Sequence, residues 1–143
     1  MDLFDLADWL EECSKNVEKE IEREAHIDAK KIQAEAKTLC PVKTGNLRNN
    51  ISTSVEWRGN TCVGIVSADA EYAPYVEYGT GIYSSLGTGR QTPWCYTPDG
   101  GNTFYWTQGQ APQPFMYPAL LNCQDRIFND LINMVGRFFK WLY

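Results

Sequence analysis

Apolar side chains recur at steps of three or four residues along the start of the chain, and this spacing predicts one long helix over residues 2–38. The repeat skips one turn near Asp28. At ~1.5 Å per residue the helix would be on the order of 50 Å long, more than a domain of this size needs. We therefore expect either that one end projects toward another subunit or that the whole stripe lies on its own core. The stripe comprises Leu3, Leu6, Leu10, Cys13, Val17, Ile21, Ala25, Ile32, Ala36 and Leu39.

Two further segments have the pattern of β-hairpins. Residues 51–57 and 61–67 are rich in β-branched side chains and are separated by Arg58-Gly59-Asn60. Residues 94–97 and 103–107 flank a turn, residues 98–102, that combines proline, aspartate, glycine and asparagine. The sequence therefore predicts two antiparallel hairpins.

The remaining pattern predicts short elements and a final helix. Pro41 ends the first helix, and Thr44 is placed to cap a short turn that carries Leu47 and Arg48. A short helix begins near Pro74 and closes at Gly79 in the left-handed conformation. Residues 81–91, rich in glycine and serine, are expected to be mobile. A C-terminal helix over residues 115–142 has an apolar stripe of Leu120, Ile127, Leu131, Val135, Phe138 and Leu142.

This order of elements predicts an α+β fold with a long N-terminal helix, an antiparallel sheet of two hairpins, a short central helix and a C-terminal helix. One domain over residues 1–143 is expected, made of the helix 1–39, a sheet and short helix over 41–112, and the helix 115–142.

Composition and charge exclude several classes of function. Residues 1–38 hold eleven acids and six bases, a net charge of −5, whereas residues 39–143 hold seven of each. No basic stripe is available for nucleic-acid phosphates, so direct sequence-specific nucleic-acid binding is not expected. No apolar run approaches the ~20 residues that span a bilayer, and the acidic start is unlike a secretory signal, so synthesis and residence in a cytoplasm are expected.

Neither a metal site nor a catalytic centre is predicted. The five cysteines are widely spaced without a C-x-x-C pair, and we interpret them as small buried residues rather than ligands or disulfides. His26, the single histidine, is interpreted as a surface residue of the first helix. Glu71 and Glu77 would lie on different faces of a helix without a partner to tune their pKa. Residues 87–90 lack the Lys-Ser/Thr of a phosphate loop. No catalytic residue, cofactor, metal or small-molecule substrate is therefore expected.

Two aromatic regions are candidates for contacts. The second hairpin carries Trp94, Tyr96, Phe104, Tyr105 and Trp106. Alternation along a strand sends half of these rings into the core, and three interpretations stay open: core packing only, a protein interface, or a platform for a planar ligand. Residues 138–143 are apolar around much of the helix, and we expect the first helix or a neighbouring subunit to cover them. Insertion into a membrane surface is a third option, which the small number of basic residues disfavours.

Three segments in this order resemble the HK97 gp10-like family of tailed-phage neck and tail-completion proteins. They are Pro41-Val42-Lys43-Thr44-Gly45-Asn46-Leu47-Arg48, Tyr72-Ala73-Pro74-Tyr75-Val76-Glu77-Tyr78-Gly79-Thr80 and Gln113-Pro114-Phe115-Met116-Tyr117-Pro118-Ala119-Leu120. Residues 106–110 also resemble members from phages or prophages of Gram-positive bacteria. Residues 80–112 form a longer span than in compact members of that family.

The resemblance implies a non-enzymatic structural protein of a tailed phage or prophage, assembled in the bacterial cytoplasm and located at the neck or tail junction. It implies partners, namely copies of the same chain in a ring and the neighbouring head–tail joining or tail proteins. It also implies that the short helix lies near a subunit contact. Because the first and second motifs carry opposite charges, we further hypothesise that Arg48 pairs with Glu77. The candidate interface residues are Thr44, Gly45, Leu47, Arg48, Tyr72, Ala73, Tyr75, Glu77, Gly79, Thr80, Trp106, Pro114, Phe115 and Pro118.

Two alternatives remain open. One is a soluble ligand-binding module that uses the aromatic hairpin over residues 94–107, and the other is a closely related tail terminator.

Overall fold

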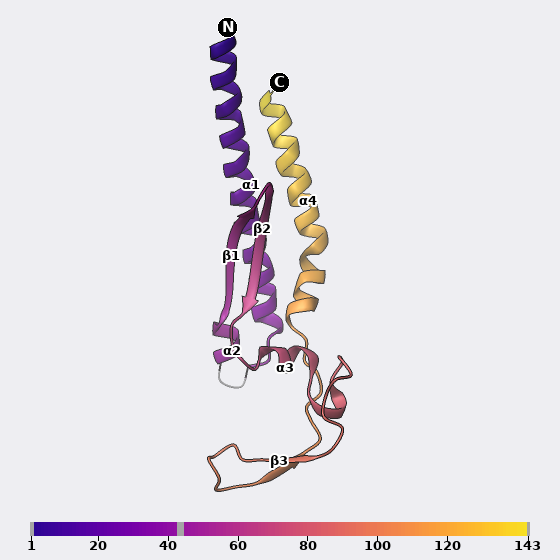
Figure 1. The fold of residues 1–143 in the computed structure, drawn as a ribbon. Helices are drawn as coiled ribbons and strands as arrows, with labels where there is room; N and C mark the ends of the chain where they lie inside the picture. The colour runs from indigo at the N-terminus through magenta and orange to yellow at the C-terminus, as the bar shows by residue number, and fades with distance from the viewer. Residues whose placement is uncertain (1, 43–44, 143) are drawn as a thin grey trace. The chain divides into compact units, whose positions relative to one another are not determined.

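A computed structural model describes residues 2–42 and 45–142. These described residues form four helices, a short 3₁₀ turn and four strands (Figure 1). Their bounds are α1 Leu3–Leu39, α2 Asn46–Asn49, β1 Ile51–Arg58, β2 Thr61–Ala68, α3 Ala73–Tyr78, η1 Gly81–Tyr83, β3 Trp94–Tyr96, β4 Tyr105–Thr107 and α4 Met116–Leu142.

The chain groups into two compact units. Unit 1 comprises Met1–Glu35, Ser52–Ser67 and Leu120–Tyr143, and unit 2 comprises Ala36–Ile51 and Ala68–Ala119. The expectation of one domain over the whole chain stays a prediction.

The long N-terminal helix is confirmed, and its start is fixed by two aspartates. Asp2 Oδ1 accepts hydrogen bonds from the backbone N–H groups of Phe4 (2.8 Å) and Asp5 (2.9 Å). The Asp5 carboxylate in turn accepts from the N–H of Asp2 at 3.2 Å. This reciprocal arrangement satisfies N–H groups that have no partner inside the helix. At the other end, the N–H of Cys40 still donates to the carbonyl of Ala36, and Pro41 follows.

Unit 1 is built around α1. The β1–β2 hairpin lies along α1, and α4 runs beside α1 in the opposite direction (Figure 1). The approach of hairpin to helix is close, since a Cβ at Gly64 would lie 3.4 Å from the carbonyl oxygen of Ala25. Lys31 of α1 is hydrogen-bonded to Asp130 of α4. Ala29 and Met134 are buried, so this unit has a narrow core of small and flexible side chains.

Unit 2 contains α2, α3, η1 and the second hairpin. The strands β3 and β4 pair antiparallel, with Trp94 opposite Thr107 and Tyr96 opposite Tyr105. The two predicted hairpins form two separate two-stranded sheets, β1–β2 and β3–β4, because no hydrogen-bonded ladder joins them. The second hairpin is also shorter than predicted, with three residues in each strand.

The fold class is confirmed as α+β. The segment expected to be mobile, residues 81–91, begins with the short helical turn η1, and its mobility stays a prediction. Across the described residues, no helix combines the length and the apolarity needed to cross a bilayer.

Candidate functional site

A single carboxylate holds the start of α4. Glu77, the fifth residue of α3, accepts hydrogen bonds from the backbone N–H groups of Phe115 (2.8 Å), Met116 (3.0 Å) and Tyr117 (3.0 Å). Glu77 and Phe115 are both buried. The N–H of Gln113 adds a bond to the carbonyl of Val76 at 2.8 Å. The second and third motifs therefore form one packed structure within unit 2.

The sequence of the third motif explains why one carboxylate is enough to cap the start of α4. A helix begins with four N–H groups that have no partner inside the helix. Here the first three belong to Phe115, Met116 and Tyr117, and the fourth position is Pro118, which has no N–H. Glu77 thus satisfies every free donor of this helix start, and its negative charge is favourable at the positive end of the helix dipole.

The glycine of the second motif permits two segments to cross closely. The N–H of Thr80 donates to the carbonyl of Gln110 (2.9 Å), and the N–H of Ile82 donates to that of Gln108 (3.1 Å). A Cβ at Gly79 would lie 2.8 Å from the Gln110 oxygen, and a Cβ at Gly81 would overlap the Gln108 carbonyl. Gly79 ends α3 with φ 76° and ψ 177°. The predicted positive φ is confirmed, but this ψ is extended rather than left-handed helical, because the chain leaves α3 to make the crossing.

The tyrosines of α3 lie on the surface while its other face is packed. Ala73 is buried, and Tyr72, Tyr75 and Tyr78 are exposed, with Tyr75 at 60%. The Tyr72 hydroxyl is bonded to the side-chain amide of Asn46 at 3.0 Å, which joins the first and second motifs. Exposed tyrosines on a rigid base offer contact area at a small cost in conformational entropy.

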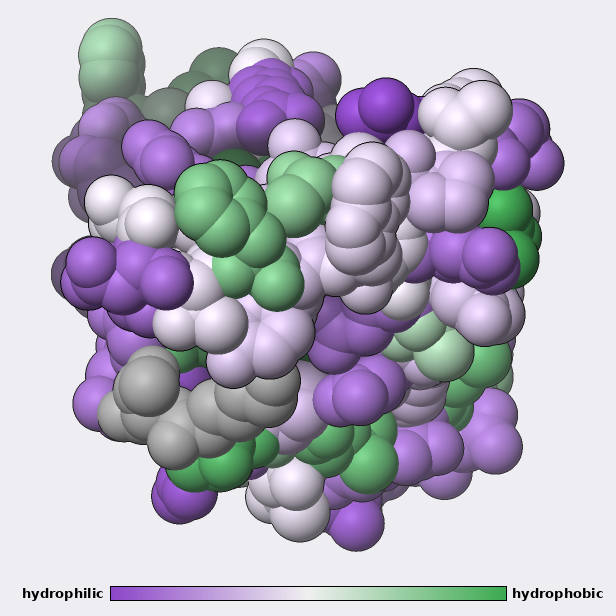
Figure 2. Space-filling view, turned by 90° about the horizontal axis from the view of Figure 1, so that it is seen from below, coloured by the Kyte–Doolittle hydropathy of each residue, from purple (hydrophilic) through white to green (hydrophobic). Residues whose placement is uncertain are grey.

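A shallow groove of about 360 Å³ adjoins these tyrosines. Tyr75 and Tyr78 line it together with Leu86 and Trp94, and the Arg90 guanidinium lies 5.7 Å from the centre of the Trp94 ring. The lining also includes Ser84, Thr88 and Arg90, and Figure 2 shows hydrophilic and hydrophobic side chains intermixed on one face of the molecule. Such a mixture is typical of protein contact surfaces rather than of an enclosed ligand cavity.

The first motif contributes a turn and one core residue. Gly45 precedes α2 with φ 78° in the left-handed conformation, and Leu47 is buried at 4% exposure. The helix starts at Asn46 with Gly45 as its N-cap residue, and the predicted cap Thr44 lies outside the described residues. Among the described residues, no ion pair joins Arg48 to Glu77. The expected pairing is wrong because Glu77 is occupied by three backbone donors, whereas Arg48 is exposed.

Most of the second hairpin's aromatic side chains face solvent. Phe104 and Trp106 are 66% and 75% exposed, Tyr96 and Tyr105 are also exposed, and Trp94 is half-buried. The Tyr96 and Tyr105 rings pair across the strands with their centres 5.9 Å apart. The exposed rings come from neighbouring as well as alternate positions, so the expected alternation between core and surface is absent from these described strands.

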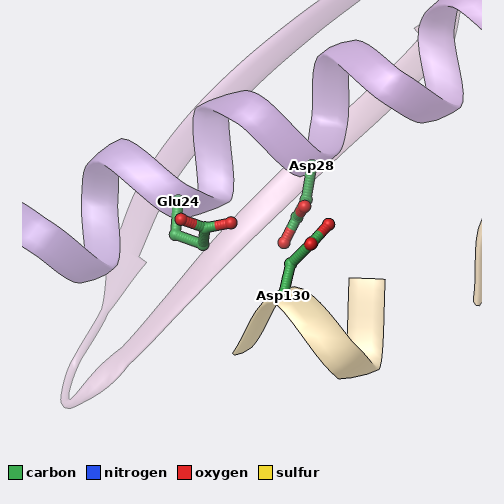
Figure 3. Close-up of side chains that lie close together, drawn as sticks. All are labelled: Glu24, Asp28 and Asp130. Carbon is green, nitrogen blue, oxygen red and sulfur yellow. The ribbon is translucent and has the colours of Figure 1, made fainter. Parts of the chain in front are cut away.

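A charged network lies between α1 and α4 in unit 1. Glu24 and Asp28 are buried on α1 and point toward Asp130 of α4, with one oxygen of each within 4.8 Å of the others (Figure 3). Lys31 bonds both aspartates, and Arg137 lies 3.7 Å from Glu24. Burial raises the pKa of Asp28, and the hydrogen bond to Lys31 partly offsets this effect. The side-chain cations that neutralise this cluster give it a structural role in joining the two helices.

The cysteines are isolated thiols in varied surroundings. Cys40 and Cys123 are buried, and burial raises the pKa of both thiols. Cys13 and Cys62 are half-buried, and Cys95 is exposed. The interpretation as small buried residues is therefore right for two of the five.

Two apolar faces of unit 1 are uncovered. The first, here named the α1 tip, lies on the first turns of α1, where Leu3 is 83% exposed. The second, the α4 stripe, follows the outer side of α4, where Phe128 is 64% exposed. The α1 tip comprises Leu3, Leu6, Trp9 and Leu10, and the α4 stripe comprises Leu121, Phe128, Leu131, Ile132, Val135 and Phe139.

These two faces answer a question that the sequence left open. The long stripe of α1 does not lie wholly on its own core, since its first turns are exposed. Near the C-terminus, Phe138 is half-buried and Phe139 is exposed, so α1 covers this segment only in part.

Sequence reasoning missed the role of Glu77. The available signal was the pattern Pro114-Phe115-Met116-Tyr117-Pro118, a helix start without Ser, Thr, Asp or Asn at the capping position. A helix start that lacks its own cap needs an acceptor from elsewhere in the chain, and a glutamate inside an otherwise apolar motif can supply one.

The family comparison matches residues 4–79 to the HK97-gp10-like family, described as "Bacteriophage HK97-gp10, putative tail-component". Neither the curated proteins nor the solved structures contain a match to this chain. The matched region includes the first motif and nearly all of the second, and it ends before the third. The chain belongs to the HK97-gp10-like family of bacteriophage tail components.

Proposed function

We propose that this protein is a non-enzymatic subunit that assembles into a ring and acts in head–tail joining or tail completion of a tailed phage. Family membership supports a structural role in the tail. The α4 stripe carries the finer proposal, because six large apolar side chains on one helix face are uncovered in a single chain. A continuous exposed face of this kind is typical of a surface that another protein covers.

Unit 2 supplies a second contact surface in this proposal. The Glu77 cap and the glycine crossing hold the α3 tyrosines on a rigid base. We assign this surface to the neighbouring joining or tail protein, since its mixed polar and aromatic character suits a contact formed between folded partners.

Deletion of the gene from a producing lysogen tests the proposal. We expect filled heads and unjoined tails, or tails of defective length, in electron micrographs, with recovery when the gene is supplied in trans. Unjoined tails of normal length favour a neck component, whereas tails of irregular length favour a terminator. Normal infectious particles from the deletion strain would overturn the assembly role.

Mass measurement of the purified protein with and without the adjacent joining protein tests the ring. A single ring-sized species with the partner present supports it. A complex that holds only one copy of this chain contradicts it.

A further inference from the structure

We propose that the α1 tip of one copy binds the C-terminal part of the α4 stripe of the next copy, so that one head-to-tail contact covers apolar surface on both helices of unit 1. This inference rests on the proposed ring and names the two surfaces that form it.

The first support is the spacing of the two faces. Leu121, Phe128 and Val135 recur every seven residues along the α4 stripe, and Ile132 and Phe139 repeat the same interval. In the α1 tip, Leu3 and Leu10 are seven residues apart, with Leu6 between them. Faces with this repeat pack side by side as helices with a small crossing angle, with side chains of one entering gaps in the other.

The second support is charge. Residues 2–12 hold five carboxylates, Asp2, Asp5, Asp8, Glu11 and Glu12, and no basic residue. Residues 131–140 of α4 hold two basic residues, Arg137 and Lys140, and no acidic one. Arg137 also contacts Glu20 and Glu24 of its own chain, while Lys140 is exposed. The acidic end of α1 and the basic end of α4 therefore attract each other across a contact between copies.

The third support is geometric. Residues 2–10 are exposed throughout, and in Figure 1 this end of α1 extends past the hairpin. It is thus free to reach a neighbour. Symmetric pairing of two α4 stripes would leave the α1 tip uncovered, whereas the head-to-tail contact uses each face once. A contact between two different faces repeats from copy to copy, and it closes into a ring when the rotation permits.

Two double variants in the full-length chain separate these arrangements. Leu6→Ser with Leu10→Ser breaks the α1 tip, and Ile132→Ser with Phe139→Ser breaks the α4 stripe. Each should weaken self-association about a hundredfold, because two large apolar side chains are removed from the contact. Sedimentation velocity over a concentration series measures the effect. Circular dichroism of each variant checks that its helices remain.

Mixing the two variants gives the decisive readout. The α1-tip variant keeps an intact α4 stripe, and the α4-stripe variant keeps an intact α1 tip. An equimolar mixture should therefore form a one-to-one dimer, although neither variant associates alone. Self-association of the α1-tip variant at native strength would show symmetric α4 pairing and overturn the proposal. A native protein that stays monomeric up to about 1 mM would overturn it as well.

Matched controls place two serines outside the two proposed contact faces. Glu18→Ser with Lys19→Ser leaves the net charge of α1 unchanged and changes two exposed positions outside its acidic end, residues 2–12. Asn129→Ser with Asn133→Ser changes exposed positions beside the α4 stripe. Both should associate as the native chain does.

The same variants distinguish this contact from the proposed function. If they associate normally but the deletion strain still lacks joined particles, the assembly role stands and the contact is wrong. If the two double variants fail to associate and also fail to restore joined particles in the deletion strain, the proposed contact and the assembly role both stand.

Discussion

Glu77 and Phe115 are 38 residues apart in the chain, yet the Glu77 carboxylate accepts the N–H of Phe115 at 2.8 Å inside a buried site. Two more backbone donors, from Met116 and Tyr117, use the same carboxylate. The short α3 helix therefore has a structural task that its length does not suggest, because it supplies the cap of α4.

Replacement of this carboxylate should destabilise the protein. Glu77→Ala leaves three buried N–H groups without an acceptor, and we expect a loss of about 2–3 kcal/mol in the free energy of unfolding. Urea denaturation measures this loss, and faster hydrogen exchange at Met116 and Tyr117 locates it. Glu71→Ala, at an exposed position just before α3, is the control and should change stability little. Equal effects from both substitutions would contradict the capping role.

Substitution of the crossing glycine should cost more than substitution of a glycine in an open turn. Gly81 and Gly87 both have positive φ, 60° and 68°, but only Gly81 lies against another backbone segment. Gly87→Ala should lose about 1–2 kcal/mol from its conformation alone. Gly81→Ala should lose clearly more, because the added methyl displaces the Gln108 carbonyl. Equal losses in urea denaturation would show that the crossing does not constrain this position.

Asp28 should produce a pH dependence of stability that opposes the usual one for a carboxylate. Burial raises its pKa above the ordinary value of 3.8, so the folded chain binds this proton more tightly than the unfolded chain does. The contribution of protonated Asp28 to the free energy of unfolding is therefore fully present below pH 3.8, and it is lost as the pH rises through the folded-state pKa.

The variant Asp28→Asn removes this titration. Its stability relative to the native chain should rise as the pH increases from below 3.8 to neutrality. Glu24, Lys31 and Asp130 surround the group and remain in both proteins, so the difference isolates Asp28. Asp125→Asn, at an exposed position of α4, serves as control. A stability difference that is constant with pH would refute the assignment.

The exposed tyrosine of α3 should matter for assembly rather than for folding. Tyr75→Ser removes a ring that is 60% exposed, so the free energy of unfolding should change by less than about 0.5 kcal/mol. Complementation of the deletion lysogen should nevertheless fall by about tenfold or more, as for a residue central to a protein contact. Tyr83→Ser, exposed on η1, is the matched control. Full complementation by Tyr75→Ser would exclude this tyrosine from the partner contact.

The elements that depend on local patterns could be predicted from the sequence. The three-to-four residue repeat placed α1 within one residue of its observed ends, and the Arg58-Gly59-Asn60 turn placed the first hairpin. Pro74 and Gly79 likewise bounded α3. In each case the deciding interactions join residues close together in the chain.

The features that depend on distant partners could not be predicted in this way. Nothing near Glu77 in the sequence indicates that its partners are the N–H groups of Phe115 to Tyr117, and pairing by charge led instead to Arg48. The extended ψ of Gly79 follows from the segment at Gln108 to Gln110, which is equally remote. The cluster of Glu24, Asp28 and Asp130 also requires that α1 and α4 be placed side by side first.

The crossing at Thr80–Ile82 and Gln108–Gln110 has a consequence for how such a protein tolerates change in length. Its hydrogen bonds clamp both ends of the intervening chain, so the start of α4 is held without any contribution from the tip of that excursion. Residues could be inserted or removed at the tip near Gly100 and Gly101, where an added Cβ atom would have open space around it. Related phages could thus diversify this tip, and an affinity tag or fluorescent label could be grafted there without disturbing the crossing or the groove beside α3.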